Sequence, residues 1–136
     1  MVSPTTGIRV VAAVIRLDGS IFAAKRREGG PAGLKWEFPG GKIEPKETPQ
    51  EALERELKEE LEMDVAVGEF IGTFSTPVGD RLIHLECYWC EARGKEFKLH
   101  VHVDAGWYDP QNLSLLDWAA PDIPVVRHVQ TCRKTD

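Results

Sequence analysis

The stretch that decides the fold is Gly41–Met63, GKIEPKETPQEALERELKEELEM. Thr48 is a typical helix N-cap, Pro49 follows in the first turn, and Glu51 completes a capping box three residues after the cap. Leucines then recur at every fourth position up to Leu61. The sequence therefore predicts an amphipathic helix that begins at Pro49, ends near Leu61 and buries its leucine stripe.

The same helix concentrates acid on one side. At about 100° per residue, Glu56, Glu59 and Glu60 fall within one sector of roughly 100° that borders the leucine stripe. Ala52, a small residue in this sector, leaves space above it. Like charges at this spacing repel each other, and carboxylate oxygens are the ligands that Mg²⁺ and Mn²⁺ prefer. The sector predicts a divalent-metal site, with a solvated acidic helix face as the alternative.

Segments with β-strand character surround the helix. Residues 8–17 form a β-branched apolar run, which is typical of a buried strand. Asp18-Gly19 is a turn signal that makes residues 21–25 the second strand of a hairpin. Further extended segments are predicted at 36–39, 65–76, 81–92 and 105–108, and a short helix that starts near 122–124 is predicted within 121–132. The order βββ-α-βββ-α favours an α/β sandwich with a mixed sheet.

Composition limits the classes of protein and of partner. The chain has 136 residues, 42% hydrophobic and 29% charged, so we expect one globular domain over residues 1–136. A net charge of -5 argues against stable nucleic-acid binding, and no apolar run reaches the roughly 20 residues of a membrane helix. Three cysteines and a start without signal-peptide features predict a cytoplasmic protein.

Two cysteines and two histidines are candidate metal ligands, but their spacing does not favour a metal site. Cys87 and Cys90 lie on a predicted strand, where positions three apart point to opposite faces, so we expect them not to share a zinc ion. His100 and His102 point to one face, and the sequence predicts a solvated edge there.

The decisive stretch resembles a known family signature. Gly41, then Glu47, then the run Arg55-Glu56-Leu57-Lys58-Glu59-Glu60 match the fixed positions and spacing of the 23-residue Nudix box. One position departs from the pattern: Glu62 stands where the family has glycine, at a helix end whose left-handed geometry favours glycine. The resemblance implies the Nudix α/β/α sandwich with a mixed β-sheet.

The resemblance covers about Val10 to Val129. The segments 25–27, 36–44 and 120–124 are similar to those of the MutT-type branch, the nucleoside triphosphate pyrophosphohydrolases. The segment 81–85 is similar to that of bacterial CTP pyrophosphohydrolases. In those proteins a glutamate often stands where this chain has Val101, and Asp104 or Glu96 is a candidate substitute.

The resemblance implies a role for each matching residue. The implied metal ligands are the Gly40 carbonyl, Glu56, Glu59 and Glu60. The implied catalytic residues are Glu56 or Glu59 as the base, together with Arg55. Gly41 and Glu47 are implied structural residues of the box, with Glu47 and Arg55 bracing the loop against the helix. The implied substrate-binding residues are Arg26, Phe38 and Asp122.

Each substrate-binding assignment has a structural alternative. Arg26 holds phosphate, faces the base or lies at a solvated strand end. Phe38, like Trp36, lines a nucleobase slot or packs in the core. Asp122 reads the base, caps the last helix or does both.

The implied reaction is Mg²⁺-dependent hydrolysis, with Mn²⁺ as an alternative ion, of (deoxy)nucleoside triphosphates to monophosphate and pyrophosphate. Oxidised or modified nucleotides such as 8-oxo-dGTP and CTP or dCTP analogues are candidate substrates, which implies nucleotide-pool sanitation and DNA repair. The alternatives are another nucleoside diphosphate derivative, such as ADP-ribose or a nucleotide sugar, or a non-catalytic Nudix module that binds nucleotides or RNA ends. The sequence leaves a monomer and a homodimer both open.

Overall fold

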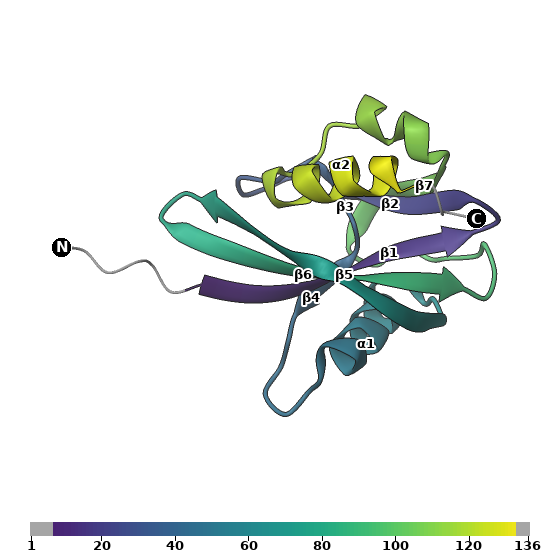
Figure 1. The fold of residues 1–136 in the computed structure, drawn as a ribbon, viewed down its shortest axis with the longest axis horizontal. Coiled ribbons are helices and arrows are strands. Elements are labelled where there is room, and N and C mark those ends of the chain that lie inside the picture. The colour runs from purple at the N-terminus through teal and green to yellow at the C-terminus, as the bar shows by residue number, and fades with distance from the viewer. Residues whose placement is uncertain (1–6, 133–136) are drawn as a thin grey trace.

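A mixed β-sheet lies between two helices in the computed structural model, which describes residues 7–132 (Figure 1). The strands of this sheet are β1 (Gly7–Leu17), β2 (Ser20–Arg26), β3 (Trp36–Glu37), β4 (Gly40–Lys42), β5 (Val65–Val78), β6 (Arg81–Ala92) and β7 (His102–Tyr108). The helices are α1 (Pro49–Leu61) and α2 (Ile123–Thr131), and two 3₁₀ turns, η1 (Pro110–Leu115) and η2 (Ala120–Asp122), precede α2. No helix in the described part of the chain is both long enough and apolar enough to cross a membrane.

Strand β1 is the centre of the sheet. The main strand order is β3-β2-β1-β6-β5, while β4 pairs with β1 and β7 pairs with β2. β1 runs parallel to β6 and antiparallel to β2 and β4, so the sheet is mixed, as predicted. Residues Val11–Ile15 are almost completely buried because both faces of β1 are covered, which explains the unbroken apolar run in the sequence.

Helix α1 begins and ends where the sequence predicts. The Thr48 side chain accepts a hydrogen bond from the Glu51 backbone N–H, and the Glu51 carboxylate accepts one from the Thr48 N–H. The leucine stripe is fully buried. The helix stops at Glu62, which has a left-handed backbone (φ 54°) and donates its N–H to the Lys58 carbonyl. Glu62 thus adopts the left-handed conformation that glycine usually occupies at a helix end.

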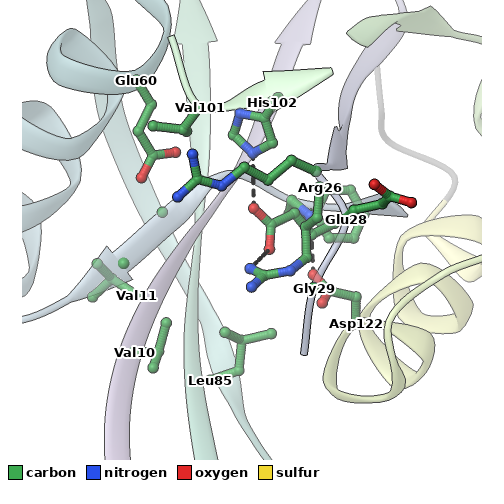
Figure 2. A pocket seen from close by; sticks show the side chains of 15 residues that line it. Val10, Val11, Arg26, Glu28, Gly29, Glu60, Leu85, Val101, His102 and Asp122 are labelled. Carbon is green, nitrogen blue, oxygen red and sulfur yellow. Dashed lines mark hydrogen bonds and ion pairs between the residues drawn. The ribbon is translucent and has the colours of Figure 1, made fainter. Parts of the chain in front are cut away.

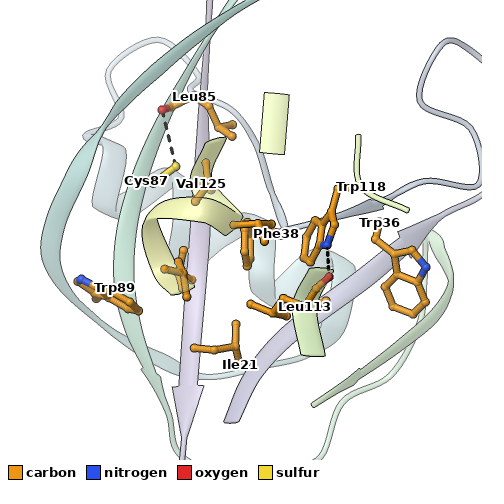
Figure 3. Close-up of a cluster of buried hydrophobic side chains, with 14 residues drawn as sticks. Ile21, Trp36, Phe38, Leu85, Cys87, Trp89, Leu113, Trp118 and Val125 are labelled. Atoms are coloured by element: carbon orange, nitrogen blue, oxygen red, sulfur yellow. Dashed lines mark hydrogen bonds between the residues drawn. The ribbon is translucent and has the colours of Figure 1, made fainter. Parts of the chain in front are cut away.

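The two faces of the sheet carry separate cores. One core packs α1 against β1, β2 and β6. The other lies under α2 and is rich in tryptophan (Figure 3). Cys87 belongs to the α2 core and Cys90 to the α1 core, so the two thiols point to opposite faces, as expected. Burial raises the pKa of both thiols, that of Cys90 to about 12.

Several elements differ from the sequence prediction. Four strands precede α1 rather than the predicted three, because Gly40–Lys42 pairs with β1 as a separate strand. β7 begins at His102, three residues earlier than predicted, and pairs with β2 along its length. The 3₁₀ turns were not predicted. They contain the prolines at 110 and 121, which start turns where no long periodic pattern exists.

Candidate functional site

The loop before α1 is tied to the helix by Arg55. Its guanidinium donates two hydrogen bonds to the Glu47 carboxylate, at 2.6 and 3.0 Å, and one to the Lys42 carbonyl at 3.2 Å. The hydrogen bonds from Arg55 and from the Glu44 backbone lower the pKa of Glu47. Glu47 also accepts a hydrogen bond from the Glu44 backbone N–H. One arginine therefore connects both ends of the loop to the middle of the helix.

The three carboxylates that the sequence groups on α1 have different surroundings. Glu59 is 61% exposed, while Glu56 is largely covered, and each approaches the same guanidinium nitrogen of Arg55, at 3.3 and 3.5 Å. Glu60 is the most deeply placed, and its Oε1 atom is buried without a hydrogen-bond partner. Burial and the neighbouring Glu56 carboxylate raise the pKa of Glu60 to about 9.

Two glycines leave room beside these carboxylates. A Cβ at Gly41 would overlap the Glu56 carboxylate, and a Cβ at Gly40 would overlap the Val11 carbonyl. The backbone therefore approaches the acidic helix face as closely as only glycine allows. We call this part of the molecule the acidic end; it consists of Gly40, Gly41, Glu56, Glu59 and Glu60.

The acidic end has oxygen ligands and uncompensated negative charge, which together suit a hard divalent cation. Oxygen ligands at this density prefer Mg²⁺ or Mn²⁺, and the unpartnered Glu60 oxygen is a buried acceptor that such an ion satisfies. Within residues 7–132, no three acidic, histidine or cysteine side chains converge tightly enough to form a finished metal site. The residues would fit a cation once the exposed Glu59 side chain turned from Arg55 toward the other two carboxylates.

A cavity of about 540 Å³ opens beside the acidic end (Figure 2). Six of the residues predicted from the sequence line it: Arg26, Phe38, Gly40, Gly41, Glu60 and Asp122. Glu47, Arg55, Glu56 and Glu59 are not among its lining residues and lie behind or beside the acidic wall. Figure 2 shows Glu60 on one side of the cavity and Asp122 on the other.

Other elements supply a second group of lining residues, which we call the distal end: Arg26, Glu37, Phe38, His102 and Asp122. Here Arg26 Nη1 donates to Glu37 Oε1 at 3.0 Å, and His102 Nε2 lies 2.8 Å from Glu37 Oε2. Arg26 is therefore not simply a solvated strand end, because it forms an ion pair at the cavity.

Sequence reasoning missed two residues of the distal end. The prediction of a solvated edge is wrong for His102, whose side chain is only 2% exposed because it turns inward to Glu37. His100 does remain exposed and pairs with Glu62 at 2.6 Å. The available signal was adjacency in the sequence: Glu37 directly precedes Phe38 and His102 directly follows Val101, and both of these neighbours were singled out.

Asp122 occupies the N-cap position of α2, but its side chain is buried and directed elsewhere. Its side chain makes no capping hydrogen bond to α2. Instead, Oδ1 accepts a 2.9 Å bond from the Phe38 backbone N–H, which fixes the two residues against each other. Burial raises the pKa of Asp122 well above its ordinary value. Phe38 both lines the cavity and packs on Trp118, with ring centroids 4.7 Å apart, whereas Trp36 belongs only to the core.

Val101 faces the cavity from the segment before β7 and is 43% exposed. Neither of the candidate substitute carboxylates lines this cavity. Asp104 accepts a hydrogen bond from the Ala105 backbone N–H on β7, and Glu96 borders a separate depression with Glu62 and Arg93. The expectation that one of them replaces the missing glutamate therefore has no support in the geometry.

The comparisons with known proteins agree with this architecture. The sequence pattern of the NUDIX domain matches residues 6–129. The chain is 38% identical over 127 residues to the CTP pyrophosphohydrolase of Escherichia coli (strain K12), covering 93% of each protein. It is 35% identical over 120 residues to the 8-oxo-dGTP diphosphatase of Haemophilus influenzae, covering 80% of this chain and 88% of the relative.

Solved structures show the same fold. The solution structure of the Escherichia coli ORF135 protein superposes with a TM-score of 0.82 at 34% identity, covering 100% of this chain and 99% of that one. The crystal structure of the MutT protein from Methanosarcina mazei Go1 also reaches 0.82, at 22% identity, covering 92% of this chain and 94% of that one. The chain belongs to the Nudix family and is a Nudix hydrolase.

Proposed function

We propose that this protein hydrolyses (deoxy)nucleoside triphosphates, including oxidised or otherwise modified ones, to a nucleoside monophosphate and pyrophosphate. One observation carries the proposal: a single cavity joins the acidic end, which suits metal-bound phosphates, to a distal end that suits a nucleobase. The relatives named for CTP and 8-oxo-dGTP support the same substrate class.

In this proposal the acidic end holds Mg²⁺, or Mn²⁺ in its place, through Glu56, Glu59, Glu60 and the Gly40 carbonyl. A bound divalent ion neutralises phosphate oxygens and makes an attacking water more acidic. The water oxygen bonds to a phosphorus, the bridging P–O bond to the leaving pyrophosphate or monophosphate breaks, and Glu56 or Glu59 accepts the water proton. Arg55, held by Glu47, orients the helix carboxylates.

At the distal end, Phe38 supplies a flat apolar wall for the nucleobase. Asp122, fixed by its bond to the Phe38 N–H, hydrogen-bonds the polar edge of the base. Arg26 contacts the substrate from the end of β2, where its side chain is 45% exposed. A slot with one apolar wall and a few fixed polar groups is the usual way to select a small ligand.

The test is a hydrolysis panel in Mg²⁺ and, separately, in Mn²⁺, with products separated by ion exchange. It contains the standard ribo- and deoxynucleoside triphosphates, 8-oxo-dGTP, 5-methyl-dCTP, ADP-ribose and a nucleotide sugar. Pyrophosphate and monophosphate released from a triphosphate is the expected result, and kcat/KM then ranks the bases. Turnover of ADP-ribose or the nucleotide sugar alone, or of nothing in the panel, contradicts the proposal.

A further inference from the structure

Three neighbouring strands place three charged or polar side chains in one line at the distal end. Arg26 ends β2, Glu37 ends β3 and His102 begins β7. β2 lies between the other two strands and is paired with both. The Glu37 carboxylate uses one oxygen for Arg26 and the other for His102, at 3.0 and 2.8 Å. Both oxygens of this carboxylate are thus directed by the protein.

The backbone is arranged to bring these side chains together. His102 is the β-pairing partner of Arg26, and the register between β2 and β7 shifts between Lys25 and Arg26. Such irregularities re-aim a side chain at the edge of a site. The extra residue is Val103 on β7, and without the shift Val103 rather than His102 would pair with Arg26.

His102 is buried beyond what its own hydrogen bonding justifies. Its side chain is 2% exposed, yet Nδ1 is buried and has no partner. An ionised carboxylate only accepts hydrogen bonds, so Nε2 is the donor to Glu37. A buried nitrogen without a partner is unfavourable, and a plain apolar residue would avoid that cost. The one satisfied contact of this ring is the one that fixes Glu37.

We propose that His102 is a positioning residue that acts through Glu37 to hold the Arg26 guanidinium toward the substrate cavity. Arg26 is long and 45% exposed, so its guanidinium would otherwise sample many rotamers. Glu37 is only 18% exposed, and the hydrogen bond from the buried His102 imidazole fixes the orientation of its carboxylate. This inference rests on the proposed function, because it assumes that Arg26 contacts the substrate.

The test compares kcat and KM of four variants on the triphosphate that the wild type prefers. His102→Leu removes the donor, and His102→Gln restores an amide N–H near the Nε2 position. Arg26→Ala removes the guanidinium that Glu37 holds. The double variant Arg26→Ala/His102→Leu completes a double-mutant cycle. His84→Leu is the matched control, because His84 bonds Ser75 away from the cavity. Thermal unfolding of every variant monitors the fold.

We expect His102→Leu to raise KM about tenfold with kcat changed less than about threefold, as for a lost binding contact. His102→Gln recovers most of the wild-type KM, and the double variant is no worse than Arg26→Ala alone, because the two residues act in series. His84→Leu keeps the wild-type KM. Glu37→Gln, which leaves the buried ring in place, raises KM to the same extent and decides the question if His102→Leu does not fold.

Effects of His102→Leu and Arg26→Ala on KM that multiply in the double variant overturn the inference, as does a His102→Gln variant no better than His102→Leu. In both cases the wild type still hydrolyses triphosphates, so the proposed function stands. A wild type without triphosphate turnover overturns the proposed function instead, and this inference with it.

Discussion

The two ends of the cavity treat charge in opposite ways. At the distal end, Glu37 lies between Arg26 and His102, and hydrogen bonds orient the three side chains. At the acidic end, Glu56 and Glu59 share one arginine, and the deeper Glu60 keeps a buried oxygen without a partner. At the distal end the Glu37 carboxylate has a partner for each oxygen, whereas the buried Glu60 oxygen at the acidic end has none.

The difference indicates where binding energy enters the proposed reaction. Preorganised groups lose little freedom when a ligand arrives, so they suit recognition. In the proposed reaction, a cation bound at the crowded carboxylates would offset their repulsion and would receive the phosphates. Substitutions at the acidic end should therefore alter turnover and metal response, while those at the distal end should alter affinity and base preference.

The largest expected effect is that of Glu56→Gln. Removing one carboxylate charge from the acidic end should lower kcat about 10²–10³-fold in Mg²⁺, the usual loss when one electrostatic contact to a transition state is removed. Steady-state hydrolysis of the best triphosphate measures it. Glu54→Gln is the matched control, because Glu54 is exposed on the same helix and lines no part of the cavity. Unchanged turnover in Glu56→Gln would exclude this carboxylate from the reaction.

A backbone substitution probes the same end without removing a charge. The added methyl group of Gly41→Ala would overlap the Glu56 carboxylate and force it to move. Displacing a catalytic group by about 1 Å costs on the order of 10²-fold in rate, so kcat should fall by about 10- to 100-fold. In the control Gly94→Ala, the new methyl group meets chiefly the flexible Glu96 side chain. Equal kcat for both variants would mean that the position of Glu56 is unimportant.

The acidic end could be predicted from the sequence because it is local. Helix α1 and the loop before it form one continuous stretch, so capping chemistry and a 3.6-residue period place Glu56, Glu59 and Glu60 without knowledge of the fold. Their rotamers could not be predicted: which of them is buried depends on the segment before β7, whose backbone N–H at His100 bonds the Glu60 carbonyl.

The distal end could be predicted only in part because it is assembled from β2, β3, β7 and η2. Family resemblance selected Arg26, Phe38 and Asp122, but no local rule joins His102 to Glu37 across 65 residues of chain. His102 appeared to be a solvated polar residue because alternation places histidine outside by default. Here an ion-pair partner on a neighbouring strand reversed that preference. The start of β7 was misplaced for the same reason.

A smaller effect is expected on the stability of the metal-free protein when Glu60 is replaced. Glu60→Gln replaces a buried, unpartnered carboxylate beside Glu56 with a neutral group of similar shape. Because burial and the Glu56 carboxylate disfavour the ionised form of Glu60, the neutral amide should raise the free energy of unfolding in EDTA at pH 7 by about 1–3 kcal/mol. It should also lose most of the stabilisation that Mg²⁺ gives the wild type. Urea unfolding with and without Mg²⁺ measures both, and a variant less stable than the wild type in EDTA contradicts the prediction.

The smallest expected effect is at the distal end, in Asp122→Asn. Burial favours the neutral form of Asp122, and an asparagine oxygen can still accept the bond from the Phe38 N–H, so stability should change by less than about 1 kcal/mol. The amide offers different hydrogen bonds to the base than a carboxyl group does. We therefore expect the ratio of kcat/KM between two bases to change by roughly tenfold, within the 1–3 kcal/mol that such contacts contribute. Kinetics on the ranked panel tests this, with Asp117→Asn as the control, since Asp117 pairs with Lys35 outside the cavity. If all bases lose activity equally, Asp122 supports the shape of the distal end rather than reading the base.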